Sequence, residues 1–148
     1  MLDQIIFQMN QTPAFRGILN FLSNFYPVKI EMYGKEYPSV ENAFQAAKCI
    51  NPLDRIPFTT CSAKEAKFLG RKVKTREDWN SFRLTAMQIL LERKFKYKDL
   101  REKLLQTEDI EIIEKNNWND KFWGQCKGEG KNHLGIILMN IRTSFQNK

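Results

Sequence analysis

The sequence predicts a mainly helical α+β fold, built as a single compact domain with a small β-hairpin near the N-terminus. Its 148 residues, 42% hydrophobic and 28% charged, fit one globular domain with a substantial core. Helical periodicity and helix caps dominate after residue 39, whereas the alternation typical of strands is confined to short stretches before it. No internal repeat or Pro/Gly/Ser-rich linker divides the chain, so we expect one domain over residues 1–148.

The predicted strands all lie in the first quarter of the chain. Ile5 to Met9 has the composition of a short strand. Val28 to Met32 alternates, Tyr33-Gly34-Lys35 predicts a turn, and Glu36-Tyr37 returns. Together the last three predict a β-hairpin.

Helices are predicted from caps and periodicity. Ser39 caps a helix from Val40 to about Ile50, which must end before Pro52. Ser62-Ala63-Lys64-Glu65 has the pattern of a capping box and opens a short helix that Gly70 closes.

Three further helices follow in the second half of the chain. Asp78 is positioned to cap a long helix through about Phe95, and Lys98 to Gln106 predicts another. The last helix is indicated by apolar residues at helical spacing, namely Leu134, Ile137, Leu138, Ile141 and Phe145.

The segment from Tyr37 to Lys48 carries the main functional signal. At 100° per residue, Glu41, Gln45 and Lys48 fall in one narrow sector of the predicted helix. The adjoining sector has the composition of a core face and contains Val40, Ala43, Phe44, Ala47 and Ile50. Polar groups beside an apolar face, rather than opposite it, favour a pocket wall over a solvated surface.

The long helix repeats this arrangement around Arg83. Its predicted apolar side contains Trp79, Arg83, Met87, Leu90 and Lys94. An unpaired buried charge is costly, so the Arg83 guanidinium needs a partner. Either it forms a structural ion pair with an acid, or its planar fork clamps a phosphate.

The segment from Asp120 to Asn132 is rich in glycine and lysine and precedes the last helix. Such a segment can cradle phosphate at a helix N-terminus, but its spacing is not that of a Walker A loop, and it also fits an ordinary mobile surface loop. The tryptophans at 79, 118 and 123 can stack on a nucleobase or simply pack in the core.

Composition bounds the partners and the cellular setting. The net charge of +7 favours anionic partners such as nucleotides or nucleic acid, although it also fits a plain compositional bias. The stretch Lys94 to Lys103 is dense in basic residues and typical of either a solvated helix face or a phosphate contact. The three cysteines are widely spaced and His133 is the only histidine, so we expect no metal site and no cofactor. Lacking a signal peptide or membrane span, the sequence predicts a cytoplasmic protein with reduced thiols and no membrane partner.

Carboxylates near aromatic and basic side chains suit an enzyme that cleaves an N-riboside. Breaking that bond develops positive charge on the ribose, which the carboxylate of Glu41 or Asp120 can stabilise while it positions water. Alternatively, a desolvated Lys48 amine attacks the sugar carbon and forms a Schiff base after ring opening. The sequence leaves these two routes open.

Four blocks of the sequence resemble the NADAR family, also called YbiA-like N-glycosidases. They are Leu22 to Pro27, Tyr37 to Lys48, Ala66 to Arg71, and a last block from Asp120 to Arg142 that contains Trp123-Gly124 and Asn132. The likeness extends from about Phe21 to Arg142. One departure is visible, because Gln125-Cys126 stands where the family often has glycine.

The resemblance implies a compact helical α+β fold that cleaves N-glycosidic bonds to ribose. Two substrate classes are associated with the family: ADP-ribose attached to guanine in DNA, and ribosylamino-pyrimidine phosphate intermediates of riboflavin synthesis. By position it implies Glu41 as the acidic catalytic residue and Lys48, Trp79, Asp120 and Trp123 as other pocket residues. We expect catalysis by Glu41, Lys48 and Asp120. The substrate-binding residues that we expect are Ser23, Asn24, Phe25, Tyr37, Gln45, Arg71, Trp79, Arg83, Trp123, Gly124 and Asn132.

We therefore expect an N-glycosidase that removes ADP-ribose from guanine, with ADP-ribose or a phosphorylated riboside as ligand and ADP-ribosylated DNA as a partner. The riboflavin intermediate is the alternative substrate. Two non-enzymatic alternatives are a module that senses ADP-ribose or NAD, and a nucleic-acid binder that uses Lys94 to Lys103. The sequence does not predict the oligomeric state.

Overall fold

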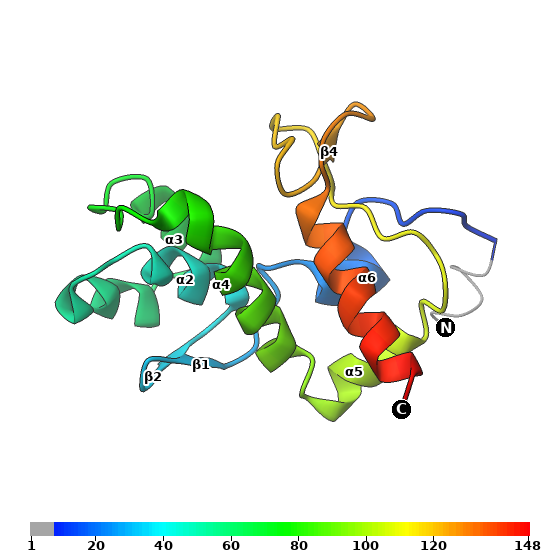
Figure 1. The fold of residues 1–148 in the computed structure, drawn as a ribbon, viewed down its shortest axis with the longest axis horizontal. Helices are drawn as coiled ribbons and strands as arrows, with labels where there is room; N and C mark the ends of the chain where they lie inside the picture. Colours follow the sequence, from blue (N-terminus) through cyan, green and yellow to red (C-terminus); the bar gives the residue numbers. More distant parts are fainter. Residues whose placement is uncertain (1–7) are drawn as a thin grey trace. The chain divides into compact units, whose positions relative to one another are not determined.

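The computed structural model describes residues 8–148, which form two compact units (Figure 1). The central unit is the continuous segment Asn24–Lys94. The terminal unit combines the described residues of Met1–Ser23 with Phe95–Lys148. Each unit joins helices to a two-stranded sheet, so the mainly helical α+β class is confirmed. The prediction of one domain over the whole chain stays a prediction.

The central unit begins with the predicted hairpin. Strands β1 (Ile30–Met32) and β2 (Lys35–Tyr37) are antiparallel, with Ile30 opposite Tyr37. Tyr33 and Gly34 both have positive φ, at 51° and 77°, as a two-residue hairpin turn requires. The Gly34 amide donates to the Glu31 carboxylate at 3.0 Å and closes the turn.

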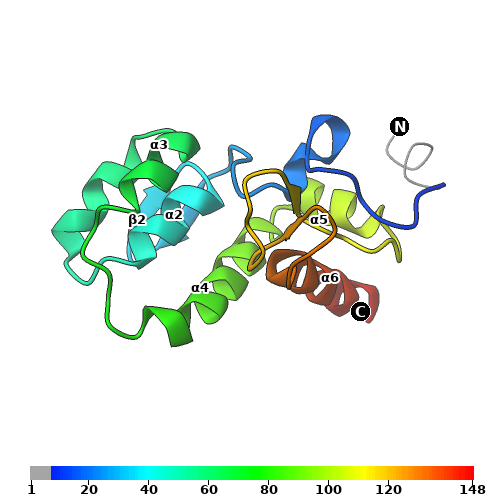
Figure 2. The same ribbon diagram turned by 90° about the horizontal axis from the view of Figure 1, so that it is seen from above.

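Helix α2 (Val40–Ala47) is the centre of this unit. Ser39 caps it by accepting from the Asn42 amide at 3.1 Å, as predicted. The fully buried Asn42 side chain donates to the carbonyls of Phe58 and Cys61, at 2.9 and 2.8 Å. These bonds fix the 3-10 helix η2 (Pro52–Thr59) and the start of helix α3 (Ala63–Leu69) against α2, and Figure 2 shows α2 and α3 close together.

The predicted capping box at the start of α3 is present. The Glu65 amide donates to the Ser62 hydroxyl and the Ser62 amide donates to the Glu65 carboxylate, both at 3.1 Å. The helix ends at Gly70, as predicted.

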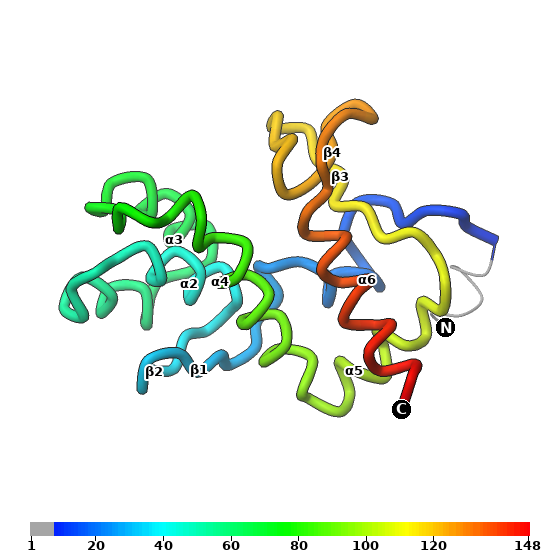
Figure 3. Tube along the Cα trace, viewed as in Figure 1, coloured from blue at the N-terminus to red at the C-terminus, as the bar shows by residue number. Residues whose placement is uncertain are grey.

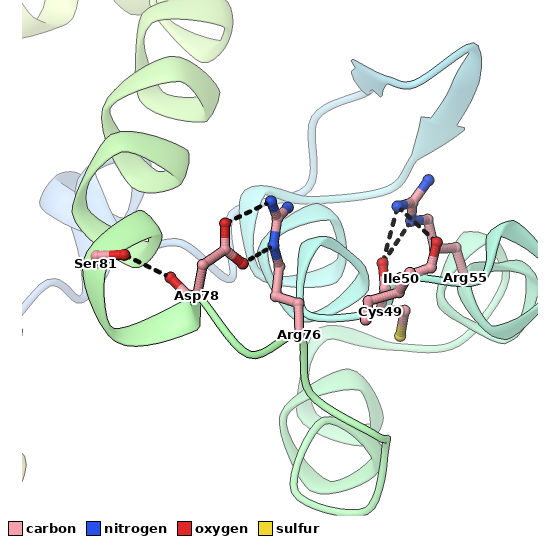
Figure 4. Close-up of polar contacts among 6 residues, drawn as sticks. All are labelled: Cys49, Ile50, Arg55, Arg76, Asp78 and Ser81. Atoms are coloured by element: carbon pink, nitrogen blue, oxygen red, sulfur yellow. Dashed lines mark hydrogen bonds and ion pairs between the residues drawn. The ribbon is translucent and has the colours of Figure 1, made fainter.

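Helix α4 (Trp79–Lys94) starts directly after Asp78, but not through the predicted side-chain cap. Both Asp78 carboxylate oxygens bind the Arg76 guanidinium, at 2.6 and 3.0 Å (Figure 4). The Ser81 hydroxyl instead donates to the Asp78 carbonyl at 2.9 Å. The two charge-assisted hydrogen bonds to arginine stabilise the carboxylate more than a single bond to a backbone amide at a helix cap would.

Figure 4 also shows how the end of α2 is held. Arg55 of η2 donates to the Cys49 carbonyl at 2.8 Å and to the Ile50 carbonyl at 3.4 Å. We predicted that α2 runs to about Ile50 and buries that side chain. The helix ends at Ala47 and Ile50 is 61% exposed, because the chain turns toward Pro52 and η2.

The terminal unit contains the 3-10 helix η1 (Gly17–Leu22) and helices α5 (Lys98–Leu105) and α6 (His133–Gln146). Strands β3 (Lys115–Asn116) and β4 (Gln125–Cys126) pair in parallel before α6 (Figure 3). Its core residues include Phe21, Leu100, Leu104, Ile112 and Leu138. Arg142 is buried on α6 and donates to the Thr107 hydroxyl and the Ile110 carbonyl, each at 2.9 Å.

Three features of the fold were not predicted: η1, η2 and the β3–β4 pair. The two strands have two residues each and the other two features are 3-10 helices, so none of the three shows the periodicity by which longer elements are predicted. Of the predicted strand Ile5 to Met9, residues 5–7 lie outside the described part of the chain, and Gln8 and Met9 are not in a strand. None of the helices within residues 8–148 combines the length and the apolar character needed to cross a membrane.

Candidate functional site

The polar sector of α2 forms a buried hydrogen-bonded pair. The Gln45 amide nitrogen Nε2 donates to the Glu41 carboxylate oxygen Oε2 at 2.6 Å. Glu41 is only 7% exposed and Gln45 6%. The Glu41 backbone amide also donates to the Asn24 carbonyl at 3.0 Å. The predicted alignment of these side chains on one helix face is confirmed, and it holds the carboxylate in a fixed position.

Lys48 lies at the C-terminal end of the same face. Its amine donates to the Gly70 carbonyl at 3.4 Å and lies 5.9 Å from the centre of the Trp79 ring. Burial lowers the pKa of Lys48, the Glu41 carboxylate raises it and Arg71 lowers it further, with a net fall from the ordinary value. More of this amine is therefore neutral at a given pH than for an ordinary lysine.

Gly70 closes the site on the α3 side. A Cβ atom added there would lie 1.9 Å from Gln45 Oε1 and 2.6 Å from Gln45 Cδ, so only glycine allows this approach. Within residues 8–148, Gln45 Oε1 is buried without a hydrogen-bond partner. A buried acceptor left unsatisfied is unusual in a folded protein.

An aromatic group forms another side of the site. The Trp79 ring lies 5.0 Å from the Phe44 ring and 6.4 Å from the Phe82 ring, measured between centroids. Phe44 comes from α2, whereas Trp79 and Phe82 come from the first turn of α4. Flat apolar surface therefore lies beside the Lys48 amine.

The other predicted ligand contacts of the central unit lie in differing environments. The Asn24 side chain donates to the Met87 sulfur at 3.5 Å, Phe25 is exposed and Arg83 is half-buried on α4. Tyr37 is fully buried, burial raises the pKa of its hydroxyl, and its charged and polar neighbours are Arg55, Cys49 and Tyr33. Those neighbours belong to the hairpin, η2 and the segment between α2 and η2, so a ligand contact of Tyr37 stays a prediction.

Asp120 belongs to the terminal unit and organises a loop there. Its oxygen Oδ1 accepts from the amides of Phe122 and Trp123, at 3.1 and 2.9 Å. The Asn116 side chain accepts from the Asp120 amide and donates to the Asp120 carbonyl. These bonds shape the segment that carries Trp123, and a catalytic role for Asp120 stays a prediction.

The remaining predicted contacts, Ser23, Gly124 and Asn132, also lie in the terminal unit. Ser23 ends η1 through its amide, which donates to the Asn20 carbonyl at 3.0 Å. A Cβ at Gly124 would lie 2.0 Å from the Glu114 carbonyl oxygen. The buried Asn132 side chain accepts from the Glu114 amide and donates to the Ile112 carbonyl, each at 2.9 Å. The structure thus gives Asn132 a scaffolding role, and ligand binding by these residues stays a prediction.

No three acidic, histidine or cysteine side chains of residues 8–148 are grouped to hold a metal ion, and all three cysteines are free thiols. The groups brought together by the central unit are a carboxylate, an amide, a lysine of lowered pKa and a tryptophan. Sequence reasoning missed the direct contact of Gly70 with Gln45, for which the only signal was a glycine at the end of a helix.

Replacing Gly70 with alanine should lower activity about tenfold or more. Gly70 has an ordinary helical φ of −62°, so alanine fits the backbone, but its Cβ must displace the Gln45 amide from Glu41. We expect a lower kcat together with a loss of about 1–3 kcal/mol in the free energy of unfolding, the usual cost of overpacking a buried contact. The control is the double variant with Gln45→Ala: if the methyl group acts through Gln45, the double variant has the activity of Gln45→Ala alone.

Comparison with known proteins places the chain in a family. The model of the NADAR domain matches residues 13–146. An N-glycosidase of Nostoc punctiforme is 35% identical over 133 residues, which cover 84% of this chain and 85% of that protein. The N-glycosidase YbiA of Escherichia coli is 30% identical over 149 residues, covering 96% and 89%.

A riboflavin biosynthesis protein of Vibrio vulnificus is 36% identical over 131 residues, covering 85% of this chain. The chain spans only about a third of that relative's length, 35%. The NMR structure of E. coli YbiA superposes with a TM-score of 0.82 at 29% identity, covering 95% of this chain and 88% of that one. The predicted family is therefore confirmed: the chain belongs to the NADAR family.

Proposed function

We propose that this NADAR-family N-glycosidase hydrolyses the bond between ribose and a base nitrogen, and that it removes ADP-ribose from guanine in nucleic acid. The observation that carries the proposal is the buried Glu41–Gln45 pair with Lys48 beside it and Trp79 close by. A fixed carboxylate beside flat aromatic surface suits a reaction in which a sugar carbon becomes positive next to a base.

In the hydrolytic route, Glu41 is the residue that faces the developing charge. The C–N bond breaks with its electron pair leaving on the base nitrogen, which takes up a proton, while water adds its oxygen to the anomeric carbon. Glu41 stabilises the ribosyl cation and orients the water, and Gln45 holds one oxygen of its carboxylate in place. Preorganised charge in a poorly hydrated site is among the most effective forms of catalysis.

In the alternative route, the neutral Lys48 amine attacks the anomeric carbon while the C–N bond to the base breaks, and the base leaves with the electron pair and takes up the proton that the amine loses. Ring opening then gives a Schiff base, which water hydrolyses to release the sugar and regenerate the amine. The lowered pKa of Lys48 favours this route, because it enlarges the neutral fraction. Cyanoborohydride reduction during turnover distinguishes the routes. The lysine route predicts a covalent ribosyl adduct on Lys48 that Lys48→Arg abolishes, whereas the carboxylate route predicts no adduct.

The pH dependence separates the same two routes. A lysine nucleophile must be neutral, so the lysine route predicts activity that rises with pH through the lowered pKa of Lys48 and then levels off. A Lys48→Met variant would lose this rising limb together with its activity. If Lys48 only contacts the substrate, the variant keeps the pH profile of the wild type and changes mainly KM.

The choice of substrate rests on charge and on the relatives. The net charge of +7 favours a polyanion, which supports ADP-ribosyl-guanine in nucleic acid. The riboflavin biosynthesis proteins among the relatives favour a ribosylamino-pyrimidine phosphate as the second candidate. Free thiols fit a reducing compartment, and we place the reaction in the cytoplasm as part of the proposal.

The test is incubation with each substrate followed by chromatography of the products. The proposal predicts free ADP-ribose and an intact guanine-containing oligonucleotide. Release of ribose 5-phosphate from the pyrimidine intermediate alone would support the second candidate. Saturable calorimetric binding of ADP-ribose with no product from either substrate would indicate a sensing module and overturn the proposal.

A further inference from the structure

A basic and aromatic stripe lies along α3 and the segment after it, and Arg71 joins it to the site just described. Its members are Lys64, Lys67, Phe68, Arg71, Lys72 and Lys74. Five of the ten residues from Lys67 to Arg76 are basic and none is acidic. The stretch Lys94 to Lys103 is equally basic but also contains Asp99 and Glu102. The charge of the stretch from Lys67 to Arg76 is therefore the less compensated of the two.

The side chains of the stripe share one face of the helix. At 100° per residue, Lys64, Lys67, Phe68, Arg71 and Lys72 fall within about 140° of one another, whereas the buried Ala66 lies on the opposite side. The helical turn continues past Gly70, since the amides of Arg71 and Lys72 donate to the carbonyls of Phe68 and Leu69. The neighbouring acid, Glu65, is engaged in the capping box. Arg76 is paired with Asp78 and is left out of the stripe.

Phe68 gives the stripe a stacking surface. Its side chain is 54% exposed although it is large and apolar, and the Lys72 amine lies 4.1 Å from the centre of its ring. An exposed ring among lysines is the combination with which proteins hold single-stranded nucleic acid: the cations follow the phosphates and the ring stacks on an unpaired base.

The stripe also leads to the candidate site. At its Gly70–Arg71 end the stripe meets α2. Gly70 contacts the Gln45 side chain, and the Gly70 carbonyl accepts from the Lys48 amine. The segment beyond is pinned to the end of α2, because Thr75 pairs with Cys49 and the Arg76 amide donates to the Lys48 carbonyl at 2.8 Å. Exposed Lys74 lies next to this pairing. A strand along the stripe would therefore run toward Glu41 and Lys48.

We propose that four exposed residues of the stripe, Lys64, Phe68, Lys72 and Lys74, form a binding surface for single-stranded nucleic acid. A strand bound there would present its modified base to the α2 site. This inference rests on the proposed function for its role in catalysis, but the binding itself is independent of cleavage.

The test uses a fluorescein-labelled 12-nucleotide single-stranded DNA and fluorescence anisotropy across a salt series. Replacing Lys64, Lys72 and Lys74 with Gln should weaken binding about tenfold or more and reduce the slope of log Kd against log salt by about 2, as expected for three lost phosphate contacts. The matched control replaces Lys96, Lys98 and Lys103 with Gln, which changes the net charge equally. Phe68→Ala should weaken single-strand binding about 5- to 100-fold and duplex binding much less.

The inference is overturned if the wild-type protein does not bind the DNA, or if both triple variants weaken binding equally. Cleavage of ADP-ribosyl-guanosine, measured in parallel, separates this from the proposed function. That cleavage should be the same in the wild type and the variant with Lys64, Lys72 and Lys74 replaced. DNA binding that depends on the stripe, without cleavage of either substrate, would refute the proposed function and leave the binding surface standing.

Discussion

Replacing Glu41 with Gln should lower turnover of an ADP-ribosyl-guanine substrate by about 10²- to 10⁴-fold, which is the usual contribution of a positioned acid or base. The charge that stabilises the ribosyl cation is removed, while the size of the side chain is nearly unchanged. The new amide oxygen can still accept from Gln45, so the pair that spans one turn of α2 survives. The loss should therefore appear in kcat rather than in stability.

The measurement is steady-state kinetics with urea unfolding of the same preparation. Glu36→Gln is the matched control, because Glu36 is an exposed glutamate on β2 of the same unit. The control should keep wild-type activity. Wild-type turnover by the Glu41 variant would remove Glu41 from the mechanism and leave Lys48 as the candidate of the α2 site.

Replacing Lys94 with Met should stabilise the protein near neutral pH and remove a pH dependence of its stability. Lys94 is fully buried at the end of α4, with its amine 5.5 Å from the centre of the Tyr26 ring, and burial lowers its pKa to about 7. The unfolded chain keeps the ordinary lysine pKa of 10.5, so between these values it binds a proton that the folded protein has released. Wild-type stability therefore rises with pH in this window.

The expected rise from pH 7 to pH 9 is about 2 kcal/mol in the free energy of unfolding, and the Lys94→Met variant should lack it. The raised pKa values of Cys49, Cys61 and Tyr37 act in the opposite direction at higher pH, since each loses stability once the unfolded group ionises. Urea unfolding at several pH values measures the difference, with exposed Lys96→Met as control. Parallel pH curves for the wild type and the Lys94 variant would show that Lys94 stays charged in the fold.

The local parts of the site were predictable from the sequence. Glu41 and Gln45 are four residues apart, so helical periodicity alone places them together, and Ser39 marks where that helix begins. The same reasoning located the hairpin and the capping box of α3. Each of these depends on residues within a few positions of one another.

The predictions that were wrong or incomplete concern contacts that a local sequence pattern does not determine. Asp78 is in a position suited to a helix cap, but its carboxylate accepts hydrogen bonds from the Arg76 guanidinium instead. Ile50 had the right spacing for the core of α2, but the helix stops before it. Gly70 meets Gln45 across 25 positions of sequence, and no local pattern reports such a contact.

The measurement that bears most directly on the account is a crystal structure of the Glu41→Gln variant with an uncleaved ADP-ribosyl-guanine nucleoside. We predict that the anomeric carbon lies in contact with the side chain at position 41, with the Lys48 amine nearby. A ligand bound with its anomeric carbon away from α2 would contradict the account.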